Sequence, residues 1–145
     1  MKIYIASKTK HAAKWRNLRS QGFNIISTWI DEAGAGESKD LSDLAIRCVN
    51  EAKTADRLIL YCEDSDILKG ALIEVGAALA AGVRCFVVGY SPSLETALNR
   101  HPLWIWTATL KDALPPLNNS VDGDLIHPAN ELSGFSITFL HGENS

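Results

Sequence analysis

The chain has 145 residues, of which 46% are hydrophobic and 21% charged, with a formal net charge of −3. This size and balance are typical of one globular domain with a sizeable core, and no apolar run is long enough to cross a bilayer. The acidic balance, without a basic stripe of interleaved aromatic residues, argues against long nucleic acid as a partner. We therefore expect a domain that binds neither a membrane nor long nucleic acid.

The N-terminus and the cysteines indicate the compartment. The first residues, MKIYIAS, contain no apolar stretch of signal-peptide length. Cys48, Cys62 and Cys85 are odd in number, and each lies in an apolar segment, which is typical of buried free thiols in a reducing compartment. We expect a cytoplasmic protein. No CxxC or HExxH spacing occurs, so we expect no metal and no cofactor.

Basic residues gather in the first 30 residues, which carry no acid. Such a run is usually a solvated helix face, but it is also compatible with an anionic partner such as phosphate.

Strand-like and helix-like segments alternate along the chain. Apolar, β-rich runs predict strands over residues 2–6, 23–28, 57–62, 84–88 and 103–107. Helical spacing predicts helices over residues 9–20, 42–52 and 68–81, with short helical turns at 94–99 and 110–114. Two loops stand out, a Gly-rich polar loop at 31–39 and an acidic loop at 63–66.

This alternation predicts an α/β fold, in which a parallel sheet carries helices on both faces. Right-handed crossovers give a doubly wound, three-layer αβα sandwich, for which we expect five strands in the order 2-1-3-4-5. Ligands of such sheets bind at the carboxyl ends of the strands, where the strand order switches. We expect the domain to span residues 1–117. We expect residues 118–145 to be a tail that packs on the domain or on a partner subunit, with 135–140 as an added strand or subunit contact.

One carboxylate stands in an otherwise apolar helix. Between Lys69 and Arg84 the only ionisable side chain is Glu74. A buried carboxylate must be paired, hydrogen-bonded or protonated, and a position near the helix N-terminus stabilises its charge. Small residues such as Gly70 share its face, so another molecule can approach closely. Glu74 is therefore either a nucleophile or a carboxylate that hydrogen-bonds a neighbouring loop.

Three segments resemble the nucleoside 2-deoxyribosyltransferase family and its relatives, the 2′-deoxynucleoside 5′-monophosphate N-glycosidases and the cytidylate hydrolases. They are residues 2–7 (KIYIAS), 55–61 (ADRLILY) and 70–76 (GALIEVG). The resemblance implies a flavodoxin-like, Rossmann-like sheet and a nucleophilic Glu at the start of a helix, here Glu74. It also implies cleavage or transfer of the N-glycosidic bond of a nucleoside or its 5′-monophosphate, through a covalent Glu74-glycosyl intermediate.

The resemblance assigns roles to further residues. Asp56 matches an Asp that helps build the active site, although Asp also commonly serves in turns and strand caps. Ser7 and Lys8 match the loop that meets the sugar 5′-hydroxyl or a 5′-phosphate. Trp29 and Asp31 match the region that covers the nucleobase, although a Trp is as often a core or interface residue.

The first expected strand and the acidic loop also contribute to the expected site. Tyr4, in that strand, lies near the edge of the sheet where ligands bind, or in the core. Many relatives have an Asp or Ser six residues before the nucleophile, where this chain has Leu68, so we expect Asp64 or Asp66 to take that role. His11 is expected on the surface. The relatives complete their sites with a neighbour's residues, so the resemblance implies a homodimer or a larger homo-oligomer.

Two other classes remain open. A nucleotide-binding or sensing module of the same fold is favoured by Leu68 at the expected polar position. A flavin-binding protein is disfavoured because residues 8–11 contain few Ser or Thr. Transferase and hydrolase differ only in the acceptor, which the sequence does not identify.

Overall fold

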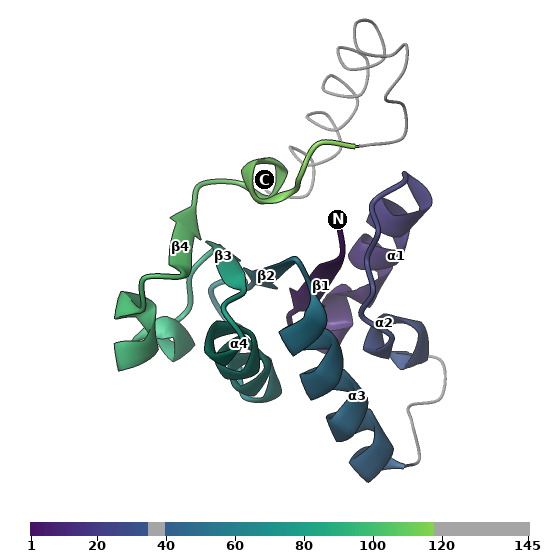
Figure 1. Cartoon of the computed structure of the whole chain (residues 1–145), viewed down its shortest axis with the longest axis horizontal. Helices are drawn as coiled ribbons and strands as arrows, with labels where there is room; N and C mark the ends of the chain where they lie inside the picture. The colour runs from purple at the N-terminus through teal and green to yellow at the C-terminus, as the bar shows by residue number, and fades with distance from the viewer. Residues whose placement is uncertain (35–39, 118–145) are drawn as a thin grey trace, which may run out of the picture.

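The computed structural model of the chain describes residues 1–34 and 40–117. A parallel sheet of four strands in the order β1-β2-β3-β4 forms its centre (Figure 1). The strands are β1 (Ile3–Ala6), β2 (Arg57–Tyr61), β3 (Arg84–Val88) and β4 (Trp104–Thr107). The helices are α1 (Ala12–Ser20), α2 (Trp29–Glu32), α3 (Leu41–Thr54), α4 (Gly70–Ala80) and α5 (Leu110–Ala113). Single 3₁₀ turns occur at Thr9–His11, Pro92–Leu94 and Ala97–Arg100. The expected α/β fold with a parallel sheet is confirmed.

The two faces of the sheet carry different helices. Helices α3 and α4 lie side by side against one face (Figure 1), and Tyr4 of β1 points toward them, because Glu74 and Cys48 both act on its hydroxyl. On the other face, the Tyr61 ring of β2 meets Trp15 of α1 edge to face. Because side chains alternate along a strand, these two tyrosines mark the opposite faces of the sheet.

The expected strand over residues 23–28 is not a strand, so the described sheet has four strands rather than five. Ile25 forms one isolated parallel bridge with Ile3 on the outer side of β1. The ladder of backbone hydrogen bonds ends there. Side chains, rather than another strand, bond the backbone groups of Ile5, the next residue of β1 whose N–H and carbonyl face this edge. The Ile5 N–H donates to Ser27 Oγ at 2.7 Å, and the Ile5 carbonyl accepts from Trp29 Nε1 at 2.9 Å. The segment still lies outside β1, as the expected strand order requires.

The remaining expectations concern cysteines, membranes and subunits. Cys48, Cys62 and Cys85 are buried and free, as expected. No helix in the described part of the chain is long and apolar enough to cross a membrane. Ile46 of α3 and Ile73 of α4 are exposed large apolar side chains, but the expected homo-oligomer stays a prediction. The expected tail, with its segment 135–140, lies outside the described residues.

Candidate active site

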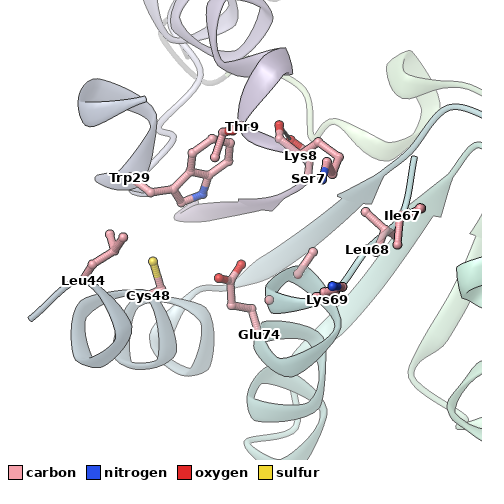
Figure 2. Close-up of a pocket in the computed structure, with 12 residues that line it drawn as sticks. Ser7, Lys8, Thr9, Trp29, Leu44, Cys48, Ile67, Leu68, Lys69 and Glu74 are labelled. Carbon is pink, nitrogen blue, oxygen red and sulfur yellow. Dashed lines mark hydrogen bonds between the residues drawn. The ribbon is translucent and has the colours of Figure 1, made fainter. Parts of the chain in front are cut away.

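A pocket of about 450 Å³ opens at the carboxyl ends of β1 and β2 (Figure 2). Three parts of the fold build its walls: residues 7–9 after β1, helices α2 and α3, and residues 67–71 at the start of α4. Here the chain crosses from the segment outside β1 to β2 on its other side, and ligands of doubly wound sheets bind at such a crossing. Its volume lies within the roughly 300–1,000 Å³ of small-molecule sites. The pocket is therefore the candidate active site.

Glu74 supplies a carboxyl group to this pocket. It lies in the second turn of α4, half-buried, and its carboxyl points between Trp29 and Cys48 (Figure 2). Burial is the main cause that raises the pKa of Glu74 to about 7, and the charge of Glu51 adds to it, whereas contacts with Tyr4 and Cys48 act in the opposite direction. A carboxyl group that titrates near neutral pH in a pocket is a mark of functional sites.

Tyr4 and Cys48 flank Glu74 as neutral groups. Burial is the largest cause that raises the pKa of Tyr4 far above its usual range, followed by the charge of Glu74. Burial also raises the pKa of the Cys48 thiol to about 11. The Tyr4 hydroxyl makes no hydrogen bond of standard geometry with the described residues, so it remains available to donate to the Glu74 carboxylate. The Glu74 carboxyl thus has two neutral hydrogen-bond donors beside it, the hydroxyl of Tyr4 and the thiol of Cys48.

The loop after β1 and the start of α4 both contribute residues to the pocket walls. Ser7, Lys8 and Gly70 all line the pocket. Ser7 is held in place, because its Oγ accepts from Trp15 Nε1 at 2.9 Å and donates to the Lys8 carbonyl at 3.0 Å. Lys69, which was not predicted as a site residue, also lines the pocket. Two cationic residues, Lys8 and Lys69, thus line the pocket, which favours an anionic ligand.

Trp29 and Asp31 lie in different surroundings in the structure. Trp29 lines the pocket, and its Nε1 is fixed on the Ile5 carbonyl, so the indole forms a rigid wall. Asp31 points elsewhere: its Oδ1 lies 2.7 Å from Nη1 of Arg19 in an exposed ion pair. Of the two residues expected to cover a nucleobase, only Trp29 lines the pocket.

Asp56 lies at the opposite edge of the sheet. It directly precedes β2, so it stands at the amino ends of the parallel strands, whereas the pocket opens at their carboxyl ends. Its carboxylate accepts from the Lys2 N–H at 2.7 Å, and its own N–H donates to the Lys2 carbonyl at 2.9 Å. This corrects the expectation that Asp56 helps build the active site, because its role is to tie β2 to the start of β1.

Asp64 and Asp66 are also outside the pocket walls. Asp64 is exposed. The Asp66 side chain is fully buried and lies 2.9 Å from His11 Nε2 and 3.0 Å from Lys10 Nζ. Burial alone would raise the pKa of Asp66, but hydrogen bonds from the Glu63 N–H, His11 and Lys10 outweigh it and lower the pKa to about 2. Neither Asp64 nor Asp66 therefore supplies the polar side chain that relatives have at the position of Leu68. His11, which was expected on the surface, is buried.

Five more wall residues were not singled out as site residues from the sequence. They are Thr9, Leu44, Cys48, Ile67 and Ala71. Cys48 and Leu44 belong to the apolar stripe of a helix, which is the ordinary pattern of a core residue. Only the packing of α3 against α4 reveals that the end of this stripe borders a pocket.

No protein-family model and no curated protein sequence matches the chain. Among solved structures, a 2-deoxyribosyltransferase from Bacillus psychrosaccharolyticus aligns over 97% of this chain and 96% of its own length, with 18% identity and a TM-score of 0.50. A CMP N-glycosidase from Clostridium botulinum aligns over 69% of this chain and 78% of its own, with 20% identity and a TM-score of 0.44. At such identity the likeness to the first structure shows the fold alone.

Proposed function

We propose that the chain is an enzyme that cleaves or transfers the N-glycosidic bond of a nucleoside or nucleoside 5′-monophosphate, with Glu74 as its nucleophile. The observation that carries the proposal is the Glu74 carboxyl, which points into a pocket of small-molecule size at the carboxyl ends of β1 and β2. The catalytic unit comprises residues 1–117, and we include a homodimer or larger homo-oligomer in the proposal.

The chemistry uses the carboxylate twice at one carbon. A Glu74 oxygen attacks the anomeric carbon, the carbon–nitrogen bond breaks, and its electron pair leaves with the base, which takes up a proton. Water or a second base then displaces Glu74 from the same carbon, which restores the carboxylate and the original configuration. A carboxylate close to the anomeric carbon also stabilises the oxocarbenium-like transition state of both steps.

The walls support a nucleotide as the ligand. The rigid Trp29 indole offers an aromatic surface for a nucleobase. Lys8 and Lys69 bring positive charge to the walls, which favours a 5′-monophosphate over a free 5′-hydroxyl.

The test compares the wild type with Glu74→Ala and Glu74→Gln on a panel of ribo- and deoxyribonucleosides and their 5′-monophosphates. Free base is followed by chromatography with and without an acceptor base, and acid-quenched protein is weighed by mass spectrometry. We expect base release and a glycosyl adduct in the wild type and in the Glu95→Gln control, whose altered carboxyl is exposed and bonded to Tyr90. Both Glu74 variants should lose release and adduct. Activity that survives in Glu74→Ala would refute the proposed nucleophile.

A binding or sensing module without turnover is the second candidate. It is favoured by Leu68, an apolar wall residue that no acid of the preceding loop replaces. The same panel separates the two candidates, because a sensor would bind a nucleotide, measured by calorimetry, and release no base.

A further inference from the structure

Two loops that flank the pocket are joined by a buried side-chain contact. The loop after β1 gives Ser7, Lys8 and Thr9 to one wall, and the loop before α4 gives residues 67–69 to another (Figure 2). His11 ends the 3₁₀ turn that continues the first loop, and Asp66 immediately precedes Ile67 in the second. His11 Nε2 and Asp66 Oδ2 are 2.9 Å apart, although 55 residues separate the two along the chain.

This contact is buried and supported from several sides. His11 is 8% exposed and Asp66 2% exposed. Lys10 Nζ lies 3.0 Å from the other Asp66 oxygen, and the Glu63 N–H donates to Asp66 Oδ2 at 2.9 Å. The Tyr61 ring packs edge to face on the imidazole, with ring centroids 5.1 Å apart. One carboxylate therefore anchors residues from both loops, and the packing leaves the imidazole little freedom to turn away.

The contact does not depend on one charge state of the imidazole. Asp66 is ionised at neutral pH, so it accepts from the neutral Nε2–H tautomer and from the imidazolium alike. Glu63 Oε2, 3.9 Å from His11 Nδ1, gives a charged ring a second acidic neighbour. Neither His11 nor Asp66 lines the pocket, so their effect on a ligand would be indirect.

We propose that His11 and Asp66 are positioning residues that clasp the two loops and fix the spacing between the walls Ser7–Thr9 and Ile67–Lys69. The function of this clasp is to hold Lys8 and Lys69 in place for the ligand while Glu74 on α4 performs the chemistry. The structural part of the proposal stands by itself, and only its effect on turnover rests on the proposed function.

The first experiment is amide hydrogen exchange, which needs no ligand and no activity. His11→Ala removes the imidazole donor, His11→Gln keeps an N–H on a side chain of similar reach, and Asp66→Asn keeps an acceptor but removes the charge. The reporters are the hydrogen-bonded N–H groups of His11, Asp66 and Leu68, which donate to Lys8, Glu63 and Ser93. Cys85→Ala is the matched control, because it opens a cavity in β3 away from both loops.

We expect His11→Ala to speed exchange at these amides by about tenfold or more, as the loss of a hydrogen bond to a charged group predicts. Exchange in β3 should change no more than the loss of global stability requires. His11→Gln should recover most of the protection, and Asp66→Asn should fall between the two. Cys85→Ala should speed exchange throughout the core without singling out the loops. Loop amides that exchange at the wild-type rate in His11→Ala, or that speed up only in step with β3, would overturn the proposal.

Steady-state kinetics on the best substrate of the panel supply the second readout. His11→Ala should raise KM about tenfold and leave kcat within about threefold, because the walls loosen while Glu74 keeps its place on α4. His11→Gln should restore KM. An unchanged KM with a large fall in kcat would overturn the positioning role. If the wild type releases no base, the proposed function fails, while the exchange experiment still decides whether the clasp exists.

Discussion

The hydroxyl of Tyr4 on β1 faces the carboxyl of Glu74 on α4, and the two groups shift each other's pKa in opposite directions. Contact with Tyr4 lowers the pKa of Glu74, whereas contact with Glu74 raises that of Tyr4. Such reciprocal shifts are expected when a neutral O–H donates to a carboxylate, because donation favours the ionised acid and the protonated phenol. Tyr4 thus offsets part of the burial that would otherwise keep Glu74 protonated at neutral pH.

The activity of the wild type should follow the ionisation of Glu74. Only the carboxylate can attack the anomeric carbon, and the pKa of Glu74 lies at about 7. We expect kcat/KM to rise about tenfold per pH unit well below pH 7 and to level off above it. Initial rates of base release between pH 5 and 8.5, corrected for any loss of folded protein, measure this limb. A flat profile down to pH 5 would show that Glu74 ionises like an exposed carboxyl or is not the nucleophile.

Replacing Tyr4 should move the acid limb of the pH–rate profile to higher pH. Tyr4→Phe removes the hydroxyl that favours the carboxylate, so the pKa of Glu74 should rise further and kcat/KM at pH 7 should fall by about three- to tenfold. Stability should change little, because the lost hydroxyl has no hydrogen bond of standard geometry in the described residues. The pH–rate profile of Tyr4→Phe is compared with that of Tyr90→Phe, which alters an exposed hydroxyl outside the pocket. Identical acid limbs in the two variants would contradict the role of Tyr4.

Glu74 should also make the folded protein less stable as the pH rises. Its folded pKa lies above the value of 4.5 of a free Glu, so the unfolded chain ionises first. Relative to Glu74→Gln, the wild type should lose stability from about pH 4.5 to about pH 7 and no further above it. The difference in the free energy of unfolding between the two proteins should reach up to about 3 kcal/mol.

Urea unfolding of the wild type and Glu74→Gln at several pH values between 4 and 8.5 measures this difference. The difference between the two unfolding free energies should be smallest at pH 4. Glu95→Gln provides the control for the loss of one carboxyl, because that carboxyl is exposed and lies outside the pocket. A gain in Glu74→Gln that stays constant with pH would mean that the burial of Glu74 does not oppose its ionisation.

The sequence predicted those features that local patterns encode. Solid apolar runs placed the strands, helical spacing placed the helices, and the lone carboxylate of an apolar helix pointed to Glu74. The strand at 23–28 failed because Ser27 and Trp29, two polar-tipped side chains, take the place of backbone partners at Ile5. Nothing in the spacing of residues distinguishes such a capture from an ordinary β-ladder.

The site itself was only partly predictable, for two different reasons. The pairing of His11 with Asp66 joins loops far apart in the sequence, and only the folded sheet brings them together. Asp56 is different, because a residue just before a parallel strand must lie at the amino edge, away from a site at the carboxyl edge. The direction of the predicted third strand alone was enough to exclude Asp56 from a site at the carboxyl edge of the sheet.

Asp56→Asn tests this placement directly. The substitution removes the charge that accepts the Lys2 N–H at a position exposed to solvent, so the free energy of unfolding should fall by about 1 kcal/mol. Because Asp56 lies at the far edge of the sheet from Glu74, kcat/KM should stay within about twofold of the wild type. Urea unfolding and base release on the same preparation measure both effects. A well-folded Asp56→Asn protein that had lost most of its turnover would show that Asp56 acts in catalysis despite its position.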